Sequence, residues 1–161
     1  MKKVMLLHGV NHNMFGKRDP KQYGTITLRE INELVDNLGK ELDIQVTSFQ
    51  TNSEGEFVDK IHEAYQEQYD GVMLNAGAWT HYSYGIADAL AILECPIIEL
   101  HMSNTHKREE FRHHSVISPL ATGIIMCTIG ITKRCRSHTY AACKKISKII
   151  DIFISDLLCN D

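Results

Sequence analysis

The chain has 161 residues and a mass of 18.3 kDa, which predicts one domain spanning residues 1–161 with a sizeable core. Its 43% hydrophobic and 23% charged residues suit a globular protein, and a net charge of −3 argues against nucleic acid or an anionic membrane as partner. No apolar run reaches the ~20 residues of a membrane-spanning helix, and too few apolar residues follow Met1-Lys2-Lys3 for a signal peptide, so we expect a cytoplasmic protein.

Apolar strands and amphipathic helices alternate along the sequence. Thr27 and Glu30 have the spacing of a capping box, which predicts a helix that begins there. In chain order we expect a strand at 4–7, a helix after residue 27, a strand at 44–50, a helix at 54–65, a strand at 71–74, a helix at 83–93, strands at 96–101 and 123–127, and a last helix at 139–158.

Five strands that alternate with helices predict an α/β fold with a parallel sheet. The expected architecture is a flavodoxin-like three-layer sandwich with the strand order 2-1-3-4-5. In such a fold, ligands bind beyond the carboxyl ends of the strands. Polar residues follow the expected strands there, namely Asn11 after the first, Asn75 after the third, and His101 and Ser103 after the fourth.

The fourth strand leads into an unusual alternation of functional side chains. Glu99, His101 and Ser103 stand two residues apart, so they share one side of an extended chain. A carboxylate in an apolar strand needs a partner, and His101 is the natural one. With Arg108 and Arg112 nearby, the segment predicts a site for an anionic, hydroxylated small molecule with an acid–base group.

The first strand is followed by a loop of about 18 residues, where 2–6 is usual, and long loops of this kind are often lids or binding segments. It carries Arg18 and Tyr23. A guanidinium beside a phenol favours its ionised form, which could act as a base. The alternative is a surface tyrosine in a Gly/Pro-rich turn.

Other polar residues have structural as well as functional interpretations. His81 could cap the third helix or contact a ligand, and Asn75 could be a turn residue or a ligand contact. The charged residues 108–112 could be a solvated turn. The five cysteines are odd in number and contain no C-x-x-C pair, which argues against a disulfide framework or a thiolate zinc site.

Over residues 3 to about 125 the chain resembles the type II 3-dehydroquinate dehydratases. The resemblance rests on a series of linked motifs in the family's order. They are Gly9-Val10-Asn11, Gly16-Lys17-Arg18-Asp19-Pro20 with Tyr23-Gly24, Thr27-Leu28, Gln50-Thr51-Asn52-Ser53-Glu54-Gly55-Glu56, Ile61-His62, Asn75-Ala76-Gly77-Ala78-Trp79-Thr80-His81, Asp88-Ala89, Glu99-Leu100-His101-Met102-Ser103-Asn104 and Arg108-Glu109-Glu110-Phe111-Arg112-His113-His114-Ser115.

The resemblance implies a hydro-lyase that converts 3-dehydroquinate to 3-dehydroshikimate by anti elimination through an enolate, without metal, cofactor or Schiff base. It implies Tyr23 as the base at C2, with Arg18 favouring its ionised form. Asn11 would hold the water that stabilises the enolate oxygen. His101, oriented by Glu99, would protonate the departing C1 hydroxyl.

The resemblance also implies a set of substrate-binding residues and a homo-oligomer, a dodecamer built as a tetramer of trimers. Asp88 would come from a neighbouring subunit, and Arg108 would steady the loop or an ion pair. The implied substrate-binding residues are Asn75, His81, Asp88, Met102, Ser103 and Arg112. The route would be shikimate synthesis or quinate catabolism.

The chain departs from the family pattern at three places: Val10 replaces a proline, Ala87 replaces an arginine, and the segment after residue 127 differs. One alternative is therefore a non-catalytic ligand-binding paralogue. A metal-dependent hydrolase that uses some of the nine histidines is disfavoured because no H-E-x-x-H spacing is present. A flavin-binding module is disfavoured because the first loop lacks a Ser/Thr-rich phosphate cradle.

Overall fold

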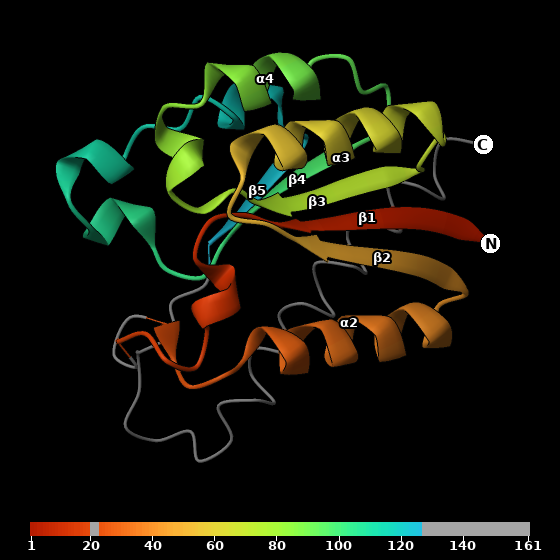
Figure 1. Cartoon of the computed structure of the whole chain (residues 1–161), viewed down its shortest axis with the longest axis horizontal. Helices are drawn as coiled ribbons and strands as arrows, with labels where there is room; N and C mark the ends of the chain where they lie inside the picture. Colours follow the sequence, from red (N-terminus) through yellow and green to blue (C-terminus); the bar gives the residue numbers. More distant parts are fainter. Residues whose placement is uncertain (20–22, 127–161) are drawn as a thin grey trace.

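A computed structural model describes residues 1–19 and 23–126, which form a five-stranded parallel sheet in the order β2-β1-β3-β4-β5 (Figure 1). The predicted strand order and flavodoxin-like α/β fold are confirmed. The strands are β1 (Lys2–His8), β2 (Ile44–Gln50), β3 (Gly71–Asn75), β4 (Ile97–His101) and β5 (Gly123–Met126). The helices are α2 (Leu28–Glu41), α3 (Glu54–Gln66) and α4 (Tyr84–Leu90), with short 3-10 turns η1 (His12–Met14), η2 (Gly77–His81), η3 (Thr105–Lys107), η4 (Glu110–Arg112) and η5 (Ser118–Leu120).

Both faces of the sheet are covered, with α3 and α4 on one side and α2 on the other (Figure 1). Alternate residues of β1 contribute to the cores on the two faces of the sheet, because successive side chains of a strand point to opposite faces. Met5 and Leu7 pack with α3 and α4, whereas Val4 and Leu6 pack toward α2. This double burial explains why β1 is a continuous apolar run.

Helix α2 begins where the sequence predicted. Thr27 is its N-cap, the Thr27 hydroxyl accepts from the Glu30 N–H, and the Glu30 carboxylate accepts from the Thr27 N–H. The capping box is therefore complete. None of the helices among the described residues is long and apolar enough to span a membrane.

The third expected helix is shorter than predicted. Ser83 is the N-cap of α4, which ends at Leu90, although the apolar pattern suggested a helix over 83–93. The residues after Leu90 instead turn toward β4, and Leu93 still packs against the core from that turn. The expected last helix at 139–158 lies outside the described residues.

The carboxyl ends of β1, β2 and β3 lie level with one another, because His8 pairs with both Gln50 and Asn75. Directly after this point Gly9 donates its N–H to the Asn75 carbonyl at 2.8 Å. A Cβ at Gly9 would lie 2.4 Å from the Ala76 carbonyl oxygen. Only glycine allows β1 and β3 to leave the sheet at this distance.

We predict that Gly9→Ala lowers the free energy of unfolding by about 2–3 kcal/mol, because the clash is with backbone and cannot be relieved by a side-chain movement. Urea unfolding measures the change. Gly85→Ala is the matched control, since nothing lies within 4 Å of a Cβ built there and the site is helical. It should leave stability unchanged or raise it by about 0.5–1 kcal/mol. Equal effects of the two substitutions would contradict the prediction.

Candidate active site

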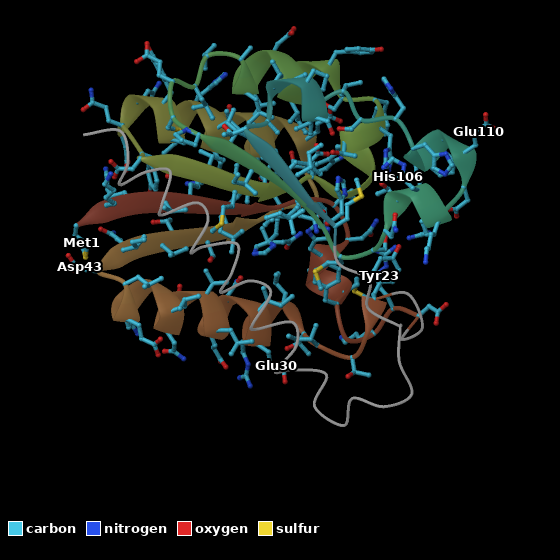
Figure 2. All side chains as sticks on the ribbon, turned by 180° about the vertical axis from the view of Figure 1, so that it is seen from behind. Met1, Tyr23, Glu30, Asp43, His106 and Glu110 are labelled. Atoms are coloured by element: carbon cyan, nitrogen blue, oxygen red, sulfur yellow. The ribbon has the colours of Figure 1, made fainter. Side chains whose placement is uncertain are left out.

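The predicted functional residues gather beyond the carboxyl ends of the strands. Figure 2 shows Tyr23 and His106 at this end of the molecule, and Met1 and Asp43 at the opposite end. The first loop and the segment after β4 therefore meet although they are far apart in the sequence. Among the described residues, no group of three or more His, Cys, Asp or Glu side chains is arranged to hold a metal ion.

The Glu99 carboxylate and the His101 imidazole form a buried pair at the end of β4. Glu99 is 0% exposed, and its Oε1 lies 2.8 Å from His101 Nε2. The expected pairing is confirmed. Because Nε2 is held by the carboxylate, the proton that this ring can offer to a ligand is the one on Nδ1.

Three hydroxyl groups also donate to the Glu99 carboxylate. Oε1 accepts from Thr80 Oγ1 at 2.6 Å and from Ser115 Oγ at 2.9 Å, and Oε2 accepts from Ser118 Oγ. Burial alone would raise the pKa of Glu99, but the hydrogen bonds from His101, Ser118 and Thr80 lower it to about 2. The carboxylate is therefore ionised at neutral pH.

Two guanidinium groups contact the Tyr23 hydroxyl. Arg18 Nη2 donates to it at 3.1 Å, and its guanidinium carbon lies 4.0 Å from the centre of the Tyr23 ring. Arg108 Nη1 donates to the same oxygen at 3.3 Å. The contacts with Tyr23 and Glu109 raise the pKa of Arg108 even though its partial burial acts in the opposite direction.

Asn11 adopts a left-handed backbone conformation, with φ 66°, at the start of η1. Its N–H donates to Asn52 Oδ1 at 2.8 Å, and Gln50 Nε2 donates to the same amide oxygen at 3.2 Å. The loop after β2 thus fixes the Asn11 backbone by accepting its N–H. Asparagine tolerates this conformation better than most residues.

Asn75 and His81 have structural contacts in addition to any contact with a ligand. Asn75 Oδ1 accepts from the Gly77 N–H at 3.2 Å, so the residue does shape the turn after β3. His81 does not cap α4, because Ser83 does; its Nδ1 lies 2.8 Å from the His114 carbonyl oxygen. Burial, with Arg112 and His101 nearby, lowers the pKa of His81 against the opposing effect of His114 and Glu99.

The remaining predicted residues differ in how the structure places them. Ser103 Oγ accepts from Arg108 Nη1 at 3.2 Å, and the same guanidinium contacts Tyr23. Met102 packs against the part of the core that lies on the α2 side of the sheet. Arg112 is paired with Glu109 at 3.0 Å. Asp88 is exposed on α4, and no hydrogen bond or ion pair in the described ranges joins it to the other predicted residues.

Some contacts of the site were not predicted from the sequence. They are made by Arg108, Thr80, Ser115 and Ser118. The family resemblance implied that Arg108 steadies the loop or an ion pair. In the structure its guanidinium contacts the hydroxyl of Tyr23, 85 positions away in the chain. The hydroxyls that surround Glu99 are ordinary Ser and Thr residues without a spacing signal. The only available signal was the buried carboxylate itself, which requires donors from somewhere.

His8, the last residue of β1, and His12, in the first loop, are both buried. His12 is 3% exposed and stacks on Phe15 at 4.6 Å, and its Nδ1 has no hydrogen-bond partner among the described residues. Burial, then the nearby His8, Arg18 and His101, lower the pKa of His12 to about 3. Burial lowers the pKa of His8 to about 4 despite a hydrogen bond to Asn32.

The sequence profile of the dehydroquinase class II family matches residues 2–141. A 3-dehydroquinate dehydratase from Syntrophotalea carbinolica is 63% identical over 131 residues, which cover 81% of this chain and 88% of that protein. One from Bacillus licheniformis is 48% identical over 125 residues, covering 78% of this chain and 86% of that protein. The crystal structure of a type II dehydroquinase from Butyrivibrio crossotus superposes with a TM-score of 0.82 and 37% identity, over 94% of this chain and 97% of that one.

We predict that His12→Leu stabilises the protein, and more so in acid. The unfolded histidine takes up a proton below about pH 6.5, whereas the folded one stays neutral down to about pH 3, so its presence costs stability as the pH falls through this range. The gain should be about 2 kcal/mol larger at pH 5 than at pH 8. Urea unfolding at both pH values measures it. His62→Leu, at an exposed position of α3, is the control; a gain that does not change with pH would count against the prediction.

Proposed function

The chain belongs to the dehydroquinase class II family, and we propose that it removes water from 3-dehydroquinate to give 3-dehydroshikimate by anti elimination through an enolate. The observation that carries the proposal is the pair of guanidinium groups at the Tyr23 hydroxyl, Arg18 at 3.1 Å and Arg108 at 3.3 Å. Positive charge on two sides of a phenol favours the phenolate, which is the form able to take a proton from carbon.

In the first step the Tyr23 phenolate removes a proton from C2 of the substrate. The electron pair passes into the neighbouring C3 carbonyl, whose oxygen becomes the enolate oxygen. A water molecule held by Asn11 stabilises this negative charge. The hydrogen bond between the Asn11 N–H and Asn52 supports this role, because it fixes the backbone of the loop and leaves the Asn11 side chain available.

In the second step the enolate re-forms the carbonyl as the bond between C1 and its hydroxyl oxygen breaks. His101 donates the proton that turns this hydroxyl into water, so a double bond forms between C1 and C2. Glu99 holds the imidazole through Nε2, which leaves the Nδ1 proton for the leaving group. A proton then returns from Tyr23 to His101 through solvent, and the atoms and charges balance over the cycle.

The substrate carboxylate binds at Ser103 and the Met102 backbone, and the ring hydroxyls bind at Asn75, His81 and Arg112. Arg112 lies on η4 and His81 on η2, and the contact of His81 with the carbonyl of His114 joins η2 to the segment that directly follows η4. Asp88 completes the site of a neighbouring subunit in a dodecamer of four trimers. Its exposure on α4 fits that arrangement. We propose a cytoplasmic enzyme of the shikimate route, or of quinate breakdown.

We predict that Tyr23→Phe lowers kcat by at least about a thousandfold, while substrate still binds with a Kd within a few-fold of the wild-type value, because only the proton acceptor is lost. Absorbance of the conjugated product measures kcat, and calorimetry measures binding. Tyr65→Phe, on the exposed face of α3, is the control and should be fully active. A Tyr23→Phe enzyme with normal turnover would remove Tyr23 from the mechanism. Binding without turnover by the wild type would identify a non-catalytic paralogue instead.

We predict that His101→Ala abolishes elimination but leaves proton exchange at C2 detectable, because the base remains and only the leaving-group proton is missing. Incorporation of deuterium from heavy water into recovered substrate measures the exchange by mass spectrometry. His62→Ala is the control, since this histidine is exposed on α3. Unchanged elimination in His101→Ala would show that another group supplies the proton.

A further inference from the structure

The hydroxyl groups around Glu99 do more than bury a charge. Three segments converge on this one carboxylate: η2 through Thr80, β4 through His101, and the chain at η5 through Ser115 and Ser118. The Thr80 carbonyl also accepts from the Val116 N–H at 2.9 Å, which joins two of these segments directly. The Glu99 oxygen that accepts a hydrogen bond from the Thr80 hydroxyl is Oε1, the same oxygen that faces the His101 imidazole.

A carboxylate whose only partner is an imidazole strongly stabilises the imidazolium cation, so the ring is a poor acid at its other nitrogen. Each additional donor takes up part of the carboxylate's negative charge, because hydrogen bonds to an ion stabilise it and lower its basicity. The stabilisation that Glu99 gives to the His101 imidazolium is thereby reduced. The ring stays oriented but can still release a proton to a leaving group.

We propose that Thr80 and Ser118 are positioning residues that act through Glu99 and set the acidity of the proton that His101 donates. The inference rests on the proposed function of His101 as the acid of the elimination. Neither residue needs to touch the substrate. Thr80 is 0% exposed, and its hydroxyl is committed to Glu99 at 2.6 Å.

Other charged groups surround the pair and have to be separated from this effect. His81 on η2 and His12 on η1 both interact electrostatically with His101, and Arg112 on η4 interacts with His81. A change at Thr80 could disturb its neighbour His81. A change at Ser118 lies on a different segment, so an effect shared by the two variants isolates Glu99.

Ser115 is not suited to the test. Its hydroxyl donates to Glu99 and also accepts from the N–H groups of Ile117 and Ser118, at 3.1 and 2.9 Å. Its removal would undo the turn as well as the contact with the carboxylate. Thr80→Val conserves shape and removes only the hydroxyl, and Ser118→Ala removes one donor to Oε2.

The experiment is the dependence of kcat on pH for Thr80→Val and Ser118→Ala, with Thr80→Ser and Ser118→Thr as variants that restore the hydroxyl. We expect kcat at neutral pH to fall by at most about three- to tenfold with KM within about twofold, because proton donation can slow by no more than the acid weakens. The alkaline limb of the pH profile of kcat should move up by about half to one pH unit, because a more basic Glu99 stabilises the imidazolium cation more strongly. The restored variants should return to the wild-type profile.

Tyr69→Phe is the matched control. The Tyr69 hydroxyl is also a buried side-chain donor, to Thr47 Oγ1 at 3.1 Å, but it precedes β3 and so lies at the opposite end of the sheet. Loss of the Tyr69 hydroxyl should lower the free energy of unfolding without moving either limb of the pH profile of kcat. A limb that stays in place in both Thr80→Val and Ser118→Ala would overturn the proposal, and so would an equal movement in Tyr69→Phe.

If Thr80→Val or Ser118→Ala fails to fold, Ser118→Cys takes its place in the experiment. A thiol keeps the approximate size of the side chain and is only a weak hydrogen-bond donor. Ser118→Cys should move the limb in the same direction by a smaller amount, and an unmoved limb overturns the proposal. An inactive wild type would remove the proposed function together with this inference. An active wild type whose variants keep its pH profile would remove this inference alone.

Discussion

One buried negative charge organises this end of the molecule. Transfer of a carboxylate from water to a protein interior is strongly unfavourable unless hydrogen-bond donors replace the lost hydration. Glu99 is fully enclosed and receives four such donors, from His101, Thr80, Ser115 and Ser118. Their positions are therefore coupled: the segments that carry them have to meet at Glu99, and the imidazole and the loop with Arg108 and Arg112 are held in place as a consequence.

A second constraint acts at the centre of the sheet. β1 pairs with both β2 and β3, and the chain leaves β1 through Gly9, within hydrogen-bond distance of Asn75. This is the point at which the strand order reverses, where ligands bind in open α/β folds. The first loop then turns through Asn11 in a left-handed conformation and brings Arg18 back to the phenol of Tyr23. The site is thus assembled from a tight backbone contact on one side and a buried ion on the other.

The features that the sequence predicted are those determined by residues close together in the chain. The box of Thr27 and Glu30 spans one helical turn, and the pairing of Glu99 with His101 follows from the alternation of a single strand. The contacts that were missed join distant residues, such as Arg108 with Tyr23, and no local spacing encodes them. The burial of His12 was also missed, because a histidine in a polar loop gives no sign that Phe15 will cover it.

The contact between Arg108 and Tyr23 also has a consequence for the order in which the surroundings of the phenol are assembled. Tyr23 precedes every strand but the first, whereas Arg108 follows β4. During synthesis on the ribosome, a nascent chain that ends at β3 contains Tyr23 and Arg18 but not yet Arg108. The second cation arrives when the next strand has joined the sheet. The contact of Tyr23 with two guanidinium groups therefore requires a chain that extends beyond β4.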